Sequence, residues 1–372
     1  MTNLVFIDYK AAFDSVDRMC IWRICEKLGL PDTLLNVLRM LYAETYSQVR
    51  VYGTMSRQFR ILSGVRQGSI LAPFLFNLAI DWIMEEALRN DNVGVSLDDT
   101  IIADLDFADD ICLMDDNGND AQRLLDNVAK NAAAVGLYLN VGKTKFCSQD
   151  INLKFHVYGE ELERVEDYTY LGSKTQLDGN VTSEIKARIG KAAGSFKNLK
   201  NIWNQRSIPQ LVKVKIYKAC VRSVLLYGCE SWPTKDSDIN SLQSFENRCL
   251  RRILHKGQDL PAESITTIAK CDSLATTIQT RRLRWLGHVL RMNPSEIPNA
   301  ALEFVKGDNW KRPPGGIRKT WRRMVRDEVK KHIKPPKMSA KKWETDWFDL
   351  CKETAQNRKQ WRGLIRDLNV AG

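Results

Sequence analysis

The sequence predicts an α+β domain at its N-terminal end, followed by a helical region and a basic helical extension. Short apolar runs such as Asn3–Tyr9 predict buried strands, and apolar residues at helical spacing surround them. Beyond Tyr170 the helical spacing continues with little strand signal. Charge is concentrated at the C-terminal end, where residues 281–372 hold 23 Lys and Arg against 10 Asp and Glu. We therefore expect three parts, at about residues 1–175, 176–270 and 271–372.

The elements of the first part are predicted in order from apolar periodicity and turn residues. The strand at residues 3–9 leads into a helix that runs to about Leu28, and Pro31 opens a second helix. Residues 73–88 are apolar around most of the helix circumference, so this helix must be buried. The other predicted elements are a hairpin at 48–62, two tightly joined strands at 101–114, and a helix at 121–135 that ends at Gly136.

The second half of the chain is predicted to be mostly helical. Helical spacing occurs at residues 183–203, 208–223, 238–254 and 275–292. A break at Pro313–Gly316 precedes a basic helix at 317–332, and a last Trp-rich helix follows Pro335-Pro336.

Composition excludes several classes of protein. The nine cysteines include no Cys-x-x-Cys pair and the four histidines lie far apart, so neither a disulfide scaffold nor a structural zinc site is expected. No apolar run approaches the roughly 18 residues of a membrane span, and the N-terminus lacks a signal-peptide pattern. We expect an intracellular protein without a membrane partner. Nucleus and cytoplasm both stay open, as does the oligomeric state.

The basic C-terminal segment is also rich in tryptophan. Six of the ten tryptophans lie in residues 281–372, among the positive charges. This combination is typical of a surface that binds a polyanion whose bases can stack. A solvated helical face with buried tryptophan anchors explains the same composition equally well.

Acidic residues stand beside two apolar strands. Asp8 follows the apolar run at 4–7, and Asp109-Asp110 lies between the apolar strands of 101–114. A carboxylate at the end of a buried strand is costly unless it is paired or binds a metal. Carboxylates that meet there would hold two divalent cations. The alternative is that Asp8 caps the next helix and that Asp109-Asp110 is only a polar hairpin tip.

Five short motifs occur in order along the first part. They are FIDYKAAFD (6–14), GVRQGSILAP (64–73), FADD (107–110), GLYLNVGKTK (136–145) and YLG (170–172). Together they resemble the palm motifs of reverse transcriptases, in the form typical of non-LTR retrotransposons. The stretch Arg281–Met292 resembles the C-terminal region of proteins that such elements encode.

The resemblance implies a fold and an activity. The fold is a reverse-transcriptase palm, with a mixed or antiparallel sheet packed on helices, at 1–175, followed by a helical thumb at 176–270 and the basic extension at 271–372. The activity is RNA-directed DNA polymerisation by two-metal nucleotidyl transfer, with two Mg²⁺ ions as cofactors and Mn²⁺ as a substitute. The partners are an RNA template, a DNA primer or target, and deoxynucleoside triphosphates.

Catalytic roles follow from the same resemblance. Asp8 and Asp109 match the principal ligands of the two catalytic Mg²⁺ ions, and Asp110 lies beside them. Lys143 matches the lysine that protonates the leaving pyrophosphate, a general-acid role. Lys145 is the competing candidate, because spacing alone does not separate the two lysines.

Binding roles are implied for three further motifs. Phe13 matches the aromatic residue that closes the nucleotide pocket against a ribose 2′-hydroxyl, and its alternative role is core packing. Gln67 and Gly68 match the loop that contacts nucleotide and template, while Arg66 would pair with a phosphate or remain solvated. The primer grip is matched by Tyr170, Leu171 and Gly172.

One departure from the family concerns the fingers, which precede the first palm motif in reverse transcriptases. Only seven residues precede Asp8. The sequence therefore predicts an N-terminally truncated palm without fingers, whose activity as an isolated chain is an open question. The alternative functions are a non-catalytic nucleic-acid-binding remnant of a retroelement and a fragment that needs a partner to supply the missing fingers.

Overall fold

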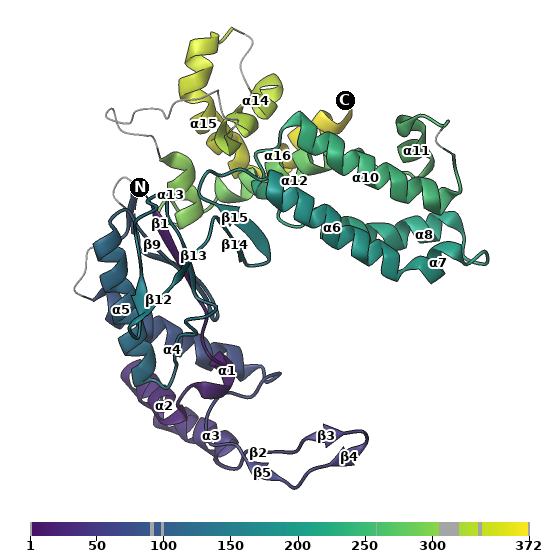
Figure 1. Ribbon diagram of the computed structural model, residues 1–372. Helices are drawn as coiled ribbons and strands as arrows, with labels where there is room; N and C mark the ends of the chain where they lie inside the picture. The colour runs from purple at the N-terminus through teal and green to yellow at the C-terminus, as the bar shows by residue number, and fades with distance from the viewer. Residues whose placement is uncertain are drawn as a thin grey trace. The chain divides into compact units, whose positions relative to one another are not determined.

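The computed structural model describes residues 2–89, 93–97, 100–257, 259–304, 320–333 and 337–370. The chain divides into two compact units, Met1–Gly172 and Ser173–Gly372 (Figure 1). Outside the described part lie the predicted break at 313–316, residues 317–319 at the start of the predicted basic helix, Trp310 and Pro335-Pro336.

The first unit is built on a mixed five-stranded sheet in the order β13-β10-β1-β9-β8. Strand β1 lies antiparallel to both β9 and β10, β8 lies antiparallel to β9, and β10 and β13 are parallel. The strands are β1 (Asn3–Ile7), β8 (Asp104–Phe107), β9 (Asp110–Asp115), β10 (Lys145–Cys147) and β13 (Glu163–Arg164). A mixed sheet packed on helices confirms the predicted fold class.

Helices cover one face of this sheet. Alternate strand residues such as Val5, Ile7 and Leu113 are buried in one apolar cluster with residues of α4 and α5. The helix predicted to run to Leu28 is two helices, because Asp17 caps α2 by accepting a hydrogen bond from the Cys20 amide at 2.9 Å. The helices are α1 (Ala12–Ser15), α2 (Arg18–Lys27), α3 (Asp32–Ala43), α4 (Leu71–Leu88) and α5 (Gly118–Ala134).

The remaining strands of the first unit are short. The hairpin predicted at 48–62 forms a ribbon that projects from the body of the unit, with β2 paired to β5 and β3 paired to β4 (Figure 1). These strands are β2 (Tyr46–Ser47), β3 (Arg50–Val51), β4 (Thr54–Met55), β5 (Phe59–Arg60), β6 (Val95–Leu97), β7 (Thr100–Ile102), β11 (His156–Val157), β12 (Glu160–Glu161) and β14 (Asp167–Tyr170).

The second unit is mainly helical, as the sequence predicts, and holds two apolar clusters. One cluster runs from Ile185 to Ile278 and the other from Leu283 to Ile365. Its elements are β15 (Ser173–Gln176), α6 (Thr182–Asn198), α7 (Lys200–Asn204), α8 (Gln210–Tyr217), a π-helical segment (Lys218–Arg222), α9 (Ser223–Leu225), a 3₁₀ turn (Cys229–Ser231), α10 (Asp236–Leu254), α11 (Ala262–Ile268), α12 (Leu274–Val289), α13 (Ile297–Glu303), α14 (Trp321–Ile333), α15 (Ala340–Gln356) and α16 (Arg358–Val370).

Three tryptophans of the C-terminal segment pack inside this unit. Trp343, Trp347 and Trp361 are buried in the second cluster. These three are therefore anchors of the helical packing. No helix among the described residues is long and apolar enough to cross a membrane.

Candidate active site

Asp8 lies directly after β1, and the turn at residues 140–144 packs against it. The Asp8 carbonyl accepts a hydrogen bond from the Asn140 amide at 2.7 Å, and the Asp8 amide donates to Thr144 Oγ1 at 3.2 Å. The amides of Lys143 and Thr144 both donate to the Asn140 carbonyl, which closes the turn. Two distant motifs are thereby joined through the backbone of Asp8.

Asp109 and Asp110 lie where β8 turns into β9. Phe107 pairs with Asp110, so Ala108 and Asp109 form a two-residue turn, in which Ala108 has a φ of 56°. Since Ile7 pairs with Ile111, the next residues along the ladder, Asp8 and Asp110, come side by side. Burial, followed by the charges of Asp109 and Asp8, raises the pKa of Asp110. The Asp110 carboxylate therefore lies within reach of the charges of Asp8 and Asp109.

The chemistry of these side chains fits a divalent cation. Carboxylate oxygens are the hard ligands that such ions prefer. Asp8 Oδ2 is buried and accepts no hydrogen bond from any residue that the structure describes. Its lone pairs are therefore free to bind a metal ion. Within the described ranges no group of three or more His, Cys, Asp or Glu side chains is placed so that it could hold a metal ion by itself. Further ligands would come from substrate phosphate and water.

The structure separates the two candidate lysines. Lys143 Nζ lies 3.6 Å from Asp8 Oδ2, and its side chain is 69% exposed. Lys145 Nζ lies 2.6 Å from Glu163 Oε2, because β10 and β13 pair at these positions. Lys143 thus lies at the carboxylates with an exposed ammonium group, whereas Lys145 belongs to a strand-to-strand ion pair.

Phe13 lies on α1, where its ring stacks on Phe76 of α4 with the centroids 4.3 Å apart. The loop at 63–69 packs against the same helix, since the Val65 amide donates to the Phe13 carbonyl at 2.7 Å. Gly64 is required for this approach: its φ is 76° and a Cβ there would lie 2.6 Å from Asp14 Cα. The Phe13 ring is half-buried, so it both packs on the core and borders the loop.

The loop presents its remaining predicted residues to solvent. Gln67 Nε2 donates to Asp14 Oδ1 at 3.2 Å. Gly68 has a φ of 90°, and no atom lies within 4 Å of the position of a Cβ, so its backbone is open to a ligand. Arg66 lies over the Tyr42 ring, 5.6 Å from its centroid, and donates to Thr45 Oγ1 at 3.3 Å.

Tyr170 supports the turn that carries the carboxylates. Its hydroxyl donates to the Leu105 carbonyl at 2.7 Å, and its ring lies 5.7 Å from that of Phe6. The next two residues, Leu171 and Gly172, have φ values of 47° and 79°. Tyr168, which the sequence reasoning missed, stacks on Phe6 with the centroids 4.2 Å apart.

Arg18 is a second residue that the sequence reasoning missed. Its guanidinium donates to the backbone carbonyls of Tyr42 at 3.2 Å, Ile61 at 3.1 Å, Ser63 at 3.0 Å and Gly64 at 2.8 Å. Burial lowers its pKa. Arg18 therefore holds residues 61–64 in place, which lead from the ribbon into the Gly64 loop.

Replacing Arg18 by alanine should release this segment. Four carbonyls lose a charged donor, and we expect the free energy of unfolding to fall by about 2–3 kcal/mol. Amide hydrogen exchange at residues 61–68 should become faster. Arg23→Ala, at an exposed position of the same helix, is the matched control. Equal exchange in both variants would show that Arg18 does not fix the loop.

Comparisons with known proteins cover the part of the chain that holds these residues. Residues 2–175 match the family model described as reverse transcriptase (RNA-dependent DNA polymerase). A putative uncharacterized transposon-derived protein of Caenorhabditis elegans is 26% identical over 71% of this chain and 95% of its own length. The Pol polyprotein of an R2 retrotransposable element of Popillia japonica is 30% identical over 68% of this chain. A probable RNA-directed DNA polymerase from transposon BS of Drosophila melanogaster is 28% identical, also over 68%.

Residues 2–175 therefore form a reverse transcriptase domain. The chain is similar to the Pol polyproteins of R2 retrotransposable elements. The matched region spans 42% of the Popillia R2 polyprotein and 29% of the BS protein.

Proposed function

We propose that this chain is an RNA-directed DNA polymerase of a non-LTR retrotransposon. The observation that supports this most is the pairing of β1 with β9, which brings Asp8 to the turn of Asp109 and Asp110 within a reverse transcriptase domain. The substrates are an RNA template, a DNA primer or target with a free 3′-hydroxyl, and deoxynucleoside triphosphates.

Each side chain has a role in this proposal. Asp8, Asp109 and Asp110 would hold two divalent cations, Mg²⁺ or in its place Mn²⁺. When bound, these ions would activate the primer hydroxyl and stabilise the charge of the transferring phosphoryl group. Lys143 donates a proton to the leaving pyrophosphate. The open backbone at Gln67 and Gly68 lets nucleotide and template approach.

Phe13, Arg66 and the Tyr170–Gly172 turn complete the site. Phe13 blocks the 2′-hydroxyl of a ribonucleotide, Arg66 of the loop contacts a phosphate, and the Tyr170–Gly172 turn holds the primer end. Residues 1–175 form the palm in this scheme, 176–270 the thumb and 271–372 the nucleic-acid-binding extension. The structure divides the chain after Gly172, close to the proposed palm boundary.

Primer extension tests the proposal. The full chain, given a DNA primer on an RNA template with Mg²⁺ and deoxynucleoside triphosphates, should extend the primer. A chelator should stop the reaction. A chain that binds the primer and template but extends no primer under any metal would instead be a non-catalytic nucleic-acid-binding remnant.

Phe13→Val should relax the choice of sugar. A smaller side chain leaves room for a 2′-hydroxyl, so incorporation of ribonucleotides should rise relative to deoxyribonucleotides by at least about tenfold. Single-nucleotide incorporation with paired dNTP and rNTP measures the ratio. Because Phe13 stacks on Phe76, Phe76→Leu is the control for loss of packing alone. The same ratio in wild type and Phe13→Val would leave Phe13 with a packing role only.

Lys143→Ala should slow nucleotide incorporation by about 10²-fold or more, the range for loss of a general acid. Lys145→Ala is the matched control, because Lys145 is held by Glu163 and lies outside the proposed chemistry. Single-turnover incorporation at saturating nucleotide measures both. An equal or larger loss of rate in Lys145→Ala would assign the general-acid role to Lys145 instead of Lys143.

A further inference from the structure

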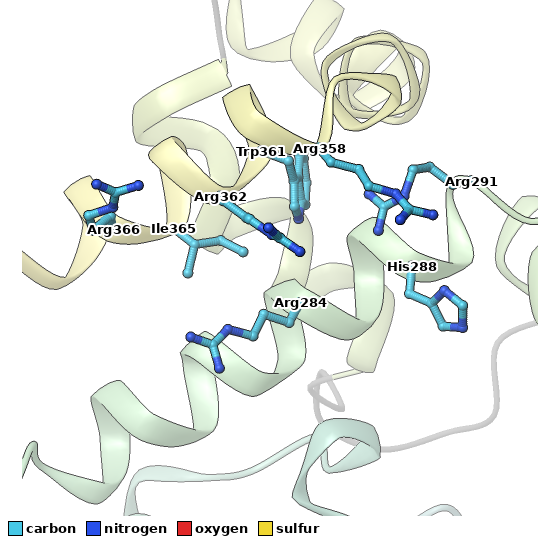
Figure 2. Close-up of a pocket in the computed structure, with 8 residues that line it drawn as sticks. All are labelled: Arg284, His288, Arg291, Arg358, Trp361, Arg362, Ile365 and Arg366. Atoms are coloured by element: carbon cyan, nitrogen blue, oxygen red, sulfur yellow. The ribbon is translucent and has the colours of Figure 1, made fainter.

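The second unit contains a strongly basic cavity between α12 and α16, with a volume of about 810 Å³ (Figure 2). Five arginines line it, and none of its described lining residues is acidic. We call it the arginine pocket, and its arginines are Arg284, Arg291, Arg358, Arg362 and Arg366.

Helical spacing explains why these side chains share one hollow. Arg284 and Arg291 are seven residues apart, on α12 and just beyond its end. Arg358, Arg362 and Arg366 follow one another at intervals of four along α16. Residues at intervals of four lie on one face of a helix, as these three do on α16, whereas Arg291 lies in the turn that follows α12. Figure 2 shows the two rows extending from facing helices around the same space.

The two helices are locked together beside the arginines. Trp361 is buried, and its Nε1 donates a hydrogen bond to the Leu283 carbonyl at 2.9 Å. The ring lies against Gly287, where a Cβ would come within 2.1 Å of Nε1. The packing therefore fixes the distance between the two rows of positive charge.

The positive charges of the pocket lack acidic partners in the described part of the chain. Other arginines of the same unit are paired: Arg188 with Glu184, Arg222 with Glu246, and Arg282 with Glu328. None of the five pocket arginines forms such a pair with a described residue.

Arg291 is the most enclosed of the five. Its Nε is buried and has no hydrogen-bond partner among the described residues, while its Nη1 donates to the Ala355 carbonyl at 3.1 Å. Burial, and then the nearby charges of Arg358 and Arg362, lower its pKa. Like charges held together in this way are stabilised when an anion enters between them.

The arrangement favours an anion with several phosphates. The planar fork of arginine matches phosphate oxygens in a bidentate manner, and two rows of arginines offer contacts to successive phosphates. The buried Trp361 is not available for base stacking. We propose that the arginine pocket binds the phosphates of a single nucleic-acid strand, independently of its base sequence.

This site is separate from the proposed catalytic residues, which all lie in the first unit. Binding to a labelled single-stranded RNA, measured by fluorescence anisotropy over a range of salt concentrations, tests it with the full chain. The test variant is Arg284→Ala/Arg358→Ala/Arg362→Ala, whose three side chains are exposed. The control is Lys359→Ala, an exposed residue of α16 that does not line the pocket.

The triple variant should weaken binding by at least about tenfold, and the log–log salt dependence should lose about 2 units of slope, at about 0.7 for each phosphate contact on a single strand. Thermal unfolding of the triple variant should match that of wild type. The wild-type chain should bind single-stranded RNA of mixed sequence and oligouridine with equal affinity, because the pocket is proposed to contact phosphates and not bases.

Three results would overturn the proposal. One is an unchanged affinity and slope in the folded triple variant. Another is an equal loss of RNA affinity in Lys359→Ala, which would show that binding depends on the overall positive charge of α16 and not on the pocket. The third is polyglutamate competing as well as RNA in wild type but not in the triple variant, which would make the ligand an acidic peptide.

Discussion

Asp8→Asn is expected to lower the rate of nucleotide incorporation by at least about 10³-fold, because it removes a ligand of ions whose stabilisation of the reacting groups amounts to several kcal/mol. The same change removes the charge that faces Lys143 at 3.6 Å. RNA binding should be unchanged, since the basic surface of the second unit is intact. Single-turnover incorporation and RNA anisotropy measure the two effects separately.

Asp126→Asn is the matched control for this variant. Asp126 is exposed on α5 and accepts a hydrogen bond from Gln122 Nε2 at 2.9 Å. Its loss should leave the rate within about twofold of wild type. An Asp8→Asn enzyme that keeps a tenth or more of the wild-type rate would contradict the role given to Asp8.

Gly287→Ala should destabilise the packing of α12 on α16. The new Cβ would lie 2.1 Å from Trp361 Nε1, so the indole must move and its hydrogen bond to Leu283 must weaken. We expect the free energy of unfolding to fall by about 2–3 kcal/mol, and RNA binding to weaken because the arginine rows move apart. Urea unfolding measures the first effect.

Gly363→Ala provides the comparison on α16. No atom lies within 4 Å of a Cβ at Gly363, so alanine should stabilise the helix by up to about 1 kcal/mol. Equal stabilities of the two variants would mean that α12 and α16 do not pack as closely as Gly287 indicates.

The layout of the first unit was readable from sequence, because apolar runs and helical periodicity are local. Strands such as β1 and β9 and the buried α4 follow from those patterns. The division of the first predicted helix at Asp17 was missed, since apolar spacing continues on both sides of the break. The Asp17 side chain, which caps α2, was the signal that could have located it.

Most residues of the candidate site could be predicted from the sequence, but their arrangement in space could not. Motif order indicated Asp8, Asp109 and Lys143, but the choice between Lys143 and Lys145 depends on the parallel pairing of β10 with β13, which no local pattern encodes. Arg18 gave no signal, because its partners are backbone carbonyls of a distant loop.

The C-terminal segment shows a similar limit. Composition alone did not decide whether its tryptophans stack on bases or pack in the core. The packing of α12 on α16 shows that Trp361 is buried. The four-residue intervals of Arg358, Arg362 and Arg366 are visible in the sequence. Their facing partners on α12 are not, since that pairing joins positions far apart along the chain.

The most direct test of the central claim is the metal dependence of single-nucleotide incorporation on an RNA template. The rate for the wild-type chain should rise with Mg²⁺ and saturate, and Mn²⁺ should support the reaction. Asp109→Asn should bind the same template without measurable incorporation. Incorporation that persists in a chelator, or proceeds equally well in Asp109→Asn, would contradict the claim that these carboxylates form a polymerase active site.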